Sequence, residues 1–186
     1  MFYDNMKMTR EFYMGDDADT ARAMLGKILC RRMPDGTVIR ARIAEVELYH
    51  QSERGCHAYG GRKTARNAAM FLPGGHAYVY FTYGMHNMFN IVVGPHECGV
   101  GVLIRAVEID GGNGPARLTR RLQITRELNG IDMCAADAPM WLEYAPAVPA
   151  RKIKRGPRIG IESAGADAKL PWRFAIGDSK YISRPI

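Results

Sequence analysis

Residues 28–49 read ILCRRMPDGTVIRARIAEVELY, and this stretch decides the fold class. Pro34-Asp35-Gly36-Thr37 is typical of a tight turn, because proline presets its own backbone angle and glycine adopts left-handed angles at little cost. The runs on either side, Ile28 to Arg31 and Val38 to Tyr49, are rich in apolar and β-branched residues. They predict two antiparallel strands joined as a hairpin.

A second hairpin is predicted further along the chain. Tyr78 to Thr82 and Asn87 to Val93 both favour strands, and Gly84 permits the turn between them. Further strands are predicted at residues 100–109, 141–144, 158–161 and 172–176. The pattern favours an α+β domain built mainly on hairpins.

Two helices are predicted beside these strands. The first is capped by Asp16, Asp19 or Thr20, runs through Met24 and stops at Gly26. The second begins at Pro115 and carries Leu118, Leu122, Thr125 and Leu128 at helical spacing up to Asn129-Gly130. Residues 1–12 are expected to be loosely held. With no repeat and no long linker, residues 1–186 are expected to form one domain.

The composition limits the class of protein. The 186 residues are 47% hydrophobic and 24% charged, an ordinary globular balance. No apolar run reaches the length of a membrane span, and the N-terminus lacks the order of a secretion signal. Four dispersed cysteines favour reduced thiols over disulfides. We expect a soluble protein with no membrane partner, cytoplasmic and nucleoid-associated in a bacterium or nuclear in a eukaryote.

The net charge of +7 points to an anionic partner, with nucleic acid as the leading choice. Part of the excess lies in two runs, Arg62 to Arg66 and Arg151 to Arg158. Their clustering favours a binding face, while the alternative is a solvated surface.

Glu45, Glu47 and Tyr49 alternate along a predicted strand, so all three project from the same face. The two carboxylates would then lie about 7 Å apart, close to an aromatic ring. Such a carboxylate can deprotonate water and stabilise an oxocarbenium-like transition state in glycosidic-bond cleavage. The alternative is an edge strand with its acidic face in water.

A second group, rich in tyrosine, combines Tyr49, His57, Tyr78, Tyr80 and Tyr83. Aromatic faces hold an unstacked base, and tyrosine and histidine can also bond its edge. Tyr78 and Tyr80 share a strand face, so at least one of them could be core packing. Tyr83, beside Gly84 at the hairpin tip, could be a wedge that enters the base stack or could fold back onto its own sheet.

No cofactor and no metal is expected. His57 lies beside Cys56, but no second ligand pair has suitable spacing. The chain also lacks the glycine-rich loops that hold nucleotides.

Several blocks in order resemble the alkyladenine (3-methylpurine) DNA glycosylase family. They are residues 42–49, 57–67, 70–71, 78–91, 102–106 and 114–118, and the match runs from about Asp16 through most of the chain. The sequence departs from the family at His86 and Asn87, where larger apolar or aromatic residues occur, and in a shorter loop before His57.

The resemblance implies a monofunctional DNA glycosylase of base excision repair, acting as a monomer on double-stranded DNA. It would flip out alkylated or deaminated purines such as 3-methyladenine and 7-methylguanine, with hypoxanthine and ethenoadenine as further candidates. The family fold is one compact domain with a curved antiparallel sheet.

The resemblance also implies roles for individual residues. Glu47 would activate water as the general base, and Arg105 would help to position it. Tyr49, His57 and Tyr80 would line the base pocket, where Asn90 would exclude the 2-amino group of guanine. The residues implied at the DNA surface are Tyr83 as the intercalating residue, Arg62 on phosphate, and Thr64, Arg66 and Met85 beside them.

Two other functions remain open at this point. One is a non-catalytic nucleic-acid-binding module, whose tyrosines would stack single-stranded bases. The other is a hydrolase of free nucleosides that uses the same carboxylate chemistry. Base release from a duplex that carries one lesion separates the glycosylase from the binding module.

Overall fold

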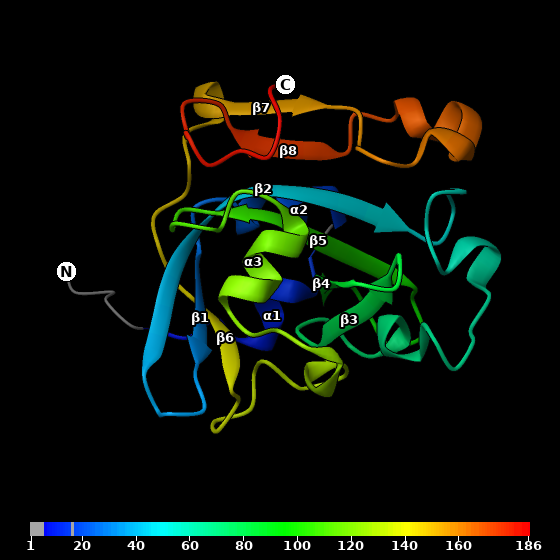
Figure 1. Cartoon of the computed structure of the whole chain (residues 1–186). Coiled ribbons are helices and arrows are strands. Elements are labelled where there is room, and N and C mark those ends of the chain that lie inside the picture. Colours follow the sequence, from blue (N-terminus) through cyan, green and yellow to red (C-terminus); the bar gives the residue numbers. More distant parts are fainter. Residues whose placement is uncertain (1–5, 16) are drawn as a thin grey trace.

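A computed structural model describes residues 6–15 and 17–186 (Figure 1). One curled antiparallel sheet has the strand order β3-β4-β5-β2-β1-β6, with β8 on β2 and β7 on β8. The strands are β1 (Ile28–Arg32), β2 (Val38–His50), β3 (Ala77–Thr82), β4 (His86–Val92), β5 (Val100–Val107), β6 (Met140–Glu143), β7 (Ile153–Gly156) and β8 (Arg173–Ile176). The expected α+β class with a curved, mostly antiparallel sheet is confirmed.

Few helices cover this sheet. They are α1 (Arg10–Tyr13), α2 (Asp17–Met24) and α3 (Pro115–Arg121), with 3-10 turns η1 (Tyr59–Gly61), η2 (Ala68–Phe71), η3 (Arg126–Leu128), η4 (Ala150–Lys152) and η5 (Glu162–Lys169). Figure 1 shows α3 in front of the sheet and α1 and α2 behind it. Across residues 6–15 and 17–186, no helix has both the length and the apolar character that a membrane crossing requires.

β2 is the centre of the sheet and positions the site. It pairs with β1 through its first half and with β5 and β8 through its second half. The register with β5 shifts between Ile43 and Val46, which marks a bulge. A bulge inserts an extra residue and changes which side chains share a face. Ile43 and Val46 therefore enter the same apolar core although they lie three positions apart in the sequence.

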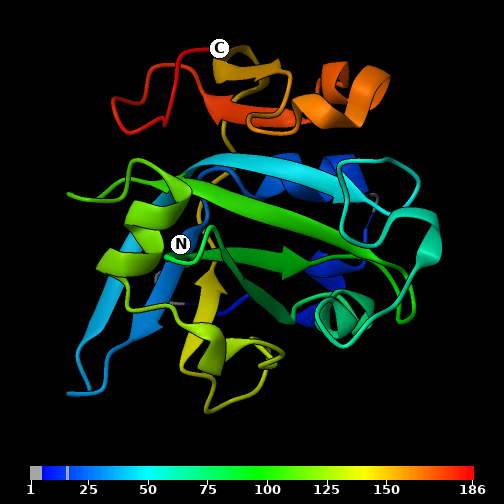
Figure 2. The same cartoon turned by 45° about the vertical axis from the view of Figure 1, so that its right-hand side comes forward.

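Two apolar cores lie around the sheet. The larger one joins the helices to the strands, and its fully buried members include Met24, Phe89, Ile104 and Leu118. The smaller one lies under the long loop that follows β2, and Tyr49 and Tyr80 pack against its edge. Figure 2 shows that this loop and η5 lie at the same end of the molecule.

The predicted strand at residues 158–161 is wrong. The chain there is irregular, and the strand that pairs with β8 is β7, immediately upstream. Arg158 is buried in an ion pair with Glu53, so this part of the second basic run does not belong to a charged surface. Alternation of apolar and polar residues cannot reveal a charge that is buried by a distant partner.

The helix predicted from Pro115 to Leu128 is shorter than expected. α3 ends at Arg121, and Gln123 has a left-handed φ of 47°. Leu122 and Ile124 are both buried, but residues two apart point to different sides of a helix. The chain leaves the helix so that both side chains enter the core, and Leu128 follows in the separate turn η3.

At the N-terminal end, the expectation of loose structure is wrong for residues 6–12, while residues 1–5 lie outside the described residues. Met8 N–H donates to the Leu142 carbonyl at 2.8 Å, and Arg10 forms an ion pair with Asp132. In the helix that follows, Asp19 and Thr20 lie inside α2 and not at its cap, and Asp16 is not described. α2 ends at Met24, and Gly26 follows with a left-handed φ of 84°, which confirms the predicted stop.

Candidate active site

Two carboxylates and two guanidinium groups form a buried cluster at the centre of the sheet. Glu45 and Glu47 on β2 are 0% exposed, and Arg105 on β5 and Arg173 on β8 are 7% and 5% exposed. The predicted common face is confirmed, because Arg105 reaches both carboxylates. The alternative of an acidic edge in water is wrong, since β2 is an interior strand.

Glu47 accepts three hydrogen bonds from the described residues. Its Oε2 accepts from Arg105 Nη1 at 3.2 Å and from the Tyr49 hydroxyl at 2.9 Å. Its Oε1 accepts from the backbone N–H of Ile159 at 2.7 Å. An ionised carboxylate offers about four acceptor sites, so one site on Oε1 is left for a further donor.

Glu45 is bonded more heavily. Its Oε1 accepts from Arg105 Nε at 3.1 Å, Arg173 Nε at 2.7 Å and the Ser183 hydroxyl at 2.9 Å, and its Oε2 accepts from Ser183 N–H at 2.5 Å. Three of these four bonds share the acceptor sites of Oε1, and one falls on Oε2. Glu45 therefore holds two guanidinium groups in place, whereas Glu47 accepts from one.

Burial raises the pKa of Glu47 above its ordinary value of 4.5, because the charged form loses its hydration. The charge of Arg105, the Ile159 N–H and the Tyr49 hydroxyl act in the opposite direction and favour the ionised form. A carboxylate whose pKa is raised in this way is a stronger base than one in water.

An aromatic hollow of about 260 Å³ lies over Glu47. Tyr49, Arg105 and Ile159, the three residues that bond Glu47, all line it. His57, Tyr80 and Tyr83 line it as well. The His57 and Tyr80 rings meet edge to face with their centres 4.6 Å apart.

Asn90 lies at the deep end of this region, in a space of about 20 Å³ shared with Tyr49, His57 and Tyr78. Such a space holds about one water molecule. The Asn90 amide donates to the Tyr78 carbonyl at 3.2 Å, and the Tyr78 hydroxyl contacts His57 Nδ1 at 2.8 Å. Burial lowers the pKa of His57 and raises the pKa of Tyr80 to about 12, which favours the neutral form of each ring.

The loop after β2 carries the basic residues Arg62 and Arg66 on its surface. It is held by Asn67, whose amide donates to the carbonyls of His57 and Arg62 at 2.8 and 2.9 Å. The N–H and hydroxyl of Thr64 both donate to Asn67 Oδ1. A phosphate contact through a Thr64 donor would therefore require one of these bonds to break.

The tip of the β3–β4 hairpin is exposed. Tyr83 and Gly84 have φ values of 52° and 67°, and the Met85 N–H donates to the Thr82 carbonyl at 3.2 Å, as in a type I′ turn. Tyr83 is 81% exposed and Met85 67%. Tyr83 is therefore not folded back onto its sheet.

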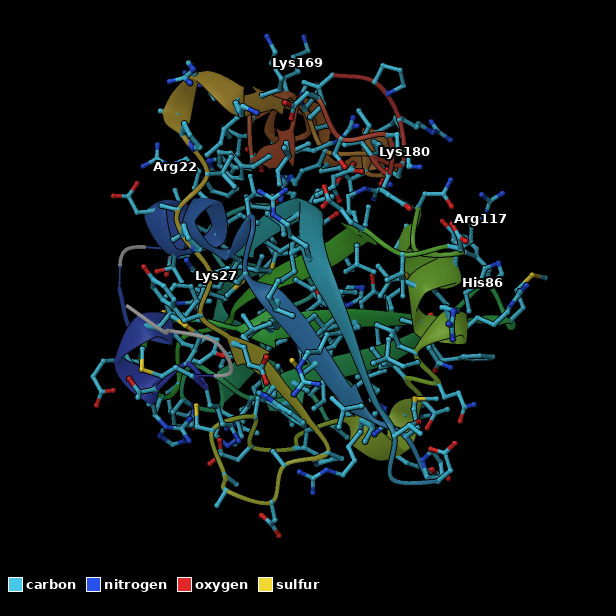
Figure 3. The ribbon with its side chains drawn as sticks, turned by 90° about the vertical axis from the view of Figure 1, so that its left-hand side faces the viewer. Arg22, Lys27, His86, Arg117, Lys169 and Lys180 are labelled. Atoms are coloured by element: carbon cyan, nitrogen blue, oxygen red, sulfur yellow. The ribbon has the colours of Figure 1, made fainter. Side chains whose placement is uncertain are left out.

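Basic side chains are spread over several elements. In Figure 3, His86 and Arg117 lie on one side of the molecule and Arg22 and Lys27 on the other. Lys169 and Lys180 lie near the β7–β8 end. In the part of the chain that the structure describes, no three histidine, cysteine, aspartate or glutamate side chains lie close enough to hold a metal ion.

The model of the methylpurine-DNA glycosylase family matches residues 11–113 and 110–180. The chain belongs to the methylpurine-DNA glycosylase family. It is accordingly an enzyme, a DNA glycosylase that hydrolyses N-glycosyl bonds. This excludes the non-catalytic binding module.

Proteins from several organisms are similar to this chain over nearly its whole length. Three of them bear the name "Putative 3-methyladenine DNA glycosylase". The protein from Streptomyces avermitilis is 41% identical, over 97% of this chain and 92% of its own length. The one from Anaeromyxobacter dehalogenans is 45% identical, over 97% and 87%. The one from Methanocella arvoryzae is 41% identical, over 95% and 96%.

In this glycosylase the structure brings together most of the residues singled out from the sequence. Tyr49, His57, Tyr80, Tyr83 and Arg105 line one hollow above Glu47. The DNA-binding candidates Arg62, Arg66 and Met85 are exposed outside it, on the loop and at the hairpin tip.

Sequence reasoning missed several residues of this glycosylase site. Arg173, Ser183 and the Ile159 N–H all bond the glutamates. Arg158, placed on a surface by its basic run, pairs with Glu53 at 2.6 Å and anchors the loop. The only signal for the two arginines was charge, which gave no indication of their partners, and no signal in the sequence pointed to Ser183 or Ile159.

Proposed function

We propose that this glycosylase flips a damaged purine out of double-stranded DNA and hydrolyses its bond to deoxyribose with a water activated by Glu47. Alkylated purines such as 3-methyladenine and 7-methylguanine are the primary substrates, with hypoxanthine and ethenoadenine as further ones. The observation that carries this proposal is the buried Glu47, with one acceptor site left, beneath an aromatic hollow beside an exposed hairpin tip.

Glu47 is a better candidate base than Glu45. A general base must accept a proton from water, so it needs a lone pair that no protein donor occupies. Each carboxylate keeps one such lone pair, but Glu45 holds two guanidinium groups and Glu47 one. Tyr49 and Ile159, which bond Glu47 and not Glu45, line the hollow. Glu45 then serves to orient Arg105.

The reaction balances without a cofactor. Water attacks the sugar carbon, its proton passes to the Glu47 carboxylate, and the bonding electron pair leaves with the purine. A purine alkylated at N3 or N7 is cationic and departs as a neutral base, so it needs little acid catalysis. The ionised Glu47 also stabilises positive charge that develops on the sugar.

Selection of the damaged base follows from the aromatic lining. Tyr49, Tyr80 and His57 offer ring faces and edges around the hollow. A cationic base gains about 0.5–2 kcal/mol from such rings, which a normal neutral base does not. Asn90, in the small space beside Tyr49 and His57, would act by rejection, with its amide opposing the 2-amino group of guanine.

The test is single-turnover base release from a panel of duplexes, each with one lesion, with an undamaged duplex as control. We expect release from alkylated purines and no strand cleavage, since water and not an amine is the nucleophile. The enzyme should act as a monomer. Release from free nucleosides alone would favour the nucleoside hydrolase.

The rate of base release should depend on pH through Glu47. The ionised form is active, and burial raises the pKa of Glu47 above 4.5, so the rate falls as the pH falls through that raised pKa. A duplex with 7-methylguanine suits the measurement, because this base stays cationic over the acid range. A rate that stays level down to pH 4.5 would contradict the assignment.

Arg62 should contribute to DNA affinity without recognising damage. Arg62→Ala is expected to weaken binding to damaged and undamaged duplexes alike, and to reduce the salt slope of log K by about one. Arg22→Ala is the matched control, because it removes one exposed charge from the side of the molecule opposite His86 (Figure 3). Equal salt slopes for Arg62→Ala and the unaltered protein would remove Arg62 from the DNA surface.

A further inference from the structure

Ser183 lies inside the charged cluster although it belongs to an irregular segment at the far end of the chain. Its hydroxyl donates to Glu45 Oε1 at 2.9 Å and accepts from Arg105 Nε and Nη2 at 3.3 and 3.2 Å. Its N–H donates to Glu45 Oε2 at 2.5 Å. One residue thus bridges the carboxylate and the guanidinium group that stand behind Glu47.

The neighbouring residues hold Ser183 in this place. Arg173, which pairs with Glu45, also donates from Nη2 to the carbonyls of Arg184 and Pro185. Ile186 packs on Gly156 of β7, where an added Cβ would lie 3.0 Å from Ile186 Cγ2. The segment Ser183–Ile186 is therefore fastened to the sheet on both sides of the cluster.

The bonds of Arg105 show what Ser183 can control. A guanidinium group is planar, so bonds to some of its nitrogens fix the direction of the others. Nε is directed to Glu45 and Ser183, Nη2 to Ser183, and Nη1 to Glu47. Without the Ser183 hydroxyl, Nη2 loses its bond and the guanidinium plane is held by Glu45 and Glu47 alone.

We propose that Ser183 is a positioning residue of the active site, which by bridging Glu45 and Arg105 holds the Arg105 guanidinium on the Glu47 carboxylate. The proposal rests on the proposed role of Glu47 as the base. Ser183 does not line the hollow, and it acts through Arg105.

The consequence for Glu47 concerns both rate and pH. The charge of Arg105 favours the ionised form of Glu47, so a looser Arg105 raises the pKa of Glu47 further. The groups around Glu47 that share this balance are Glu45 and Tyr49 on β2, Arg105 on β5, Arg173 on β8, and Tyr80 on β3. Of these groups, Ser183 bonds Arg105 and Glu45, and Ser183→Ala removes its hydroxyl from both.

The experiment compares Ser183→Ala, Ser183→Thr and Ser179→Ala in single-turnover base release against pH. Ser179 is the matched control, because its hydroxyl also donates to a carboxylate, Glu108, at 2.8 Å but far from Glu47 in the bonding network. We expect Ser183→Ala to lose about ten-fold in maximal rate, the worth of one hydrogen bond to a charged group, and to shift the acid limb to higher pH. Ser183→Thr keeps the hydroxyl and should restore both.

Lesion-DNA affinity and melting temperature are measured on the same variants. Affinity should stay within a few-fold, since Ser183 is absent from the hollow. Ser183→Cys, which keeps a weak donor, should fall between Ala and Thr and replaces Ala if that variant does not fold.

Two results would overturn the proposal. The first is an unchanged rate and pH profile in Ser183→Ala while Glu47→Gln is inactive, which leaves Glu47 as the base. The second is an equal loss at every pH that threonine does not rescue, which makes Ser183 purely structural. If Glu47→Gln is active, that result instead contradicts the proposed function, in which Glu47 is the base.

Discussion

Glu47→Gln is expected to lower single-turnover base release by roughly 10²–10⁴, the usual worth of a positioned general base. Glutamine has the shape of glutamate but cannot take a proton from water at neutral pH. Affinity for lesion DNA should stay within a few-fold, because binding needs no ionised carboxylate beneath the hollow. The acid limb of the pH profile should disappear together with the rate, since both depend on the same group.

Glu45→Gln is the matched variant, two residues away in the same buried cluster. Glu45 holds Arg105 and Arg173, so we expect its loss to reduce the melting temperature more than Glu47→Gln does. Its rate of base release should fall only to the extent that the Arg105 guanidinium is displaced from Glu47. If Glu45→Gln is inactive while Glu47→Gln keeps its activity, the two roles have been exchanged.

The face shared by Glu45, Glu47 and Tyr49 could be predicted from the sequence, because the side-chain period of a strand is local geometry. The hairpins could be predicted for the same reason, since Gly36 and Gly84 lie where the turns need left-handed angles. Tyr83 could be placed at an exposed tip, although only the structure shows that its side chain leaves the sheet.

What could not be predicted was contact between distant residues. Arg158 pairs with Glu53, 105 positions away, and Ser183 bonds Glu45, 138 positions away. No local pattern reports such pairs, and in the sequence Arg158 looks like one of several surface cations. The clustered charge of residues 151–158 therefore predicted a binding face, whereas Arg158 in that run is buried and anchors the loop after β2.

The choice between Glu45 and Glu47 needs both the sequence and the structure. Strand parity places Glu45 and Glu47 on one face but does not rank them. Their ranking came first from the family resemblance and now gains a physical reason, since Glu45 holds two guanidinium groups while Glu47 holds one and bonds two residues that line the hollow. The sequence cannot show which donors reach each carboxylate, because those donors come from β5, β8 and the segment at Ser183.

Tyr83→Ala is expected to lose the most activity on lesions in well-stacked, well-paired duplexes. Tyr83 is 81% exposed at a turn where a left-handed φ is unfavourable for a bulky residue, so packing does not explain a tyrosine there. As a wedge it would fill the gap left by the flipped nucleotide and offset part of the cost of unstacking. One lost base stack is worth about 1–3 kcal/mol, which predicts a loss of about ten- to a hundred-fold.

The benefit of a wedge depends on the substrate, and this dependence separates it from a structural residue. At a mismatch or in a single strand the base is already free to leave the stack, so Tyr83→Ala should lose little there. The melting temperature should barely change, whereas truncation of a core tyrosine would cost about 3–5 kcal/mol. Phe81→Ala is the matched control, since Phe81 is a partly exposed aromatic on the same hairpin but away from its tip. A destabilised Tyr83→Ala with the same loss on every substrate would mean that Tyr83 is packing and that the wedge lies elsewhere.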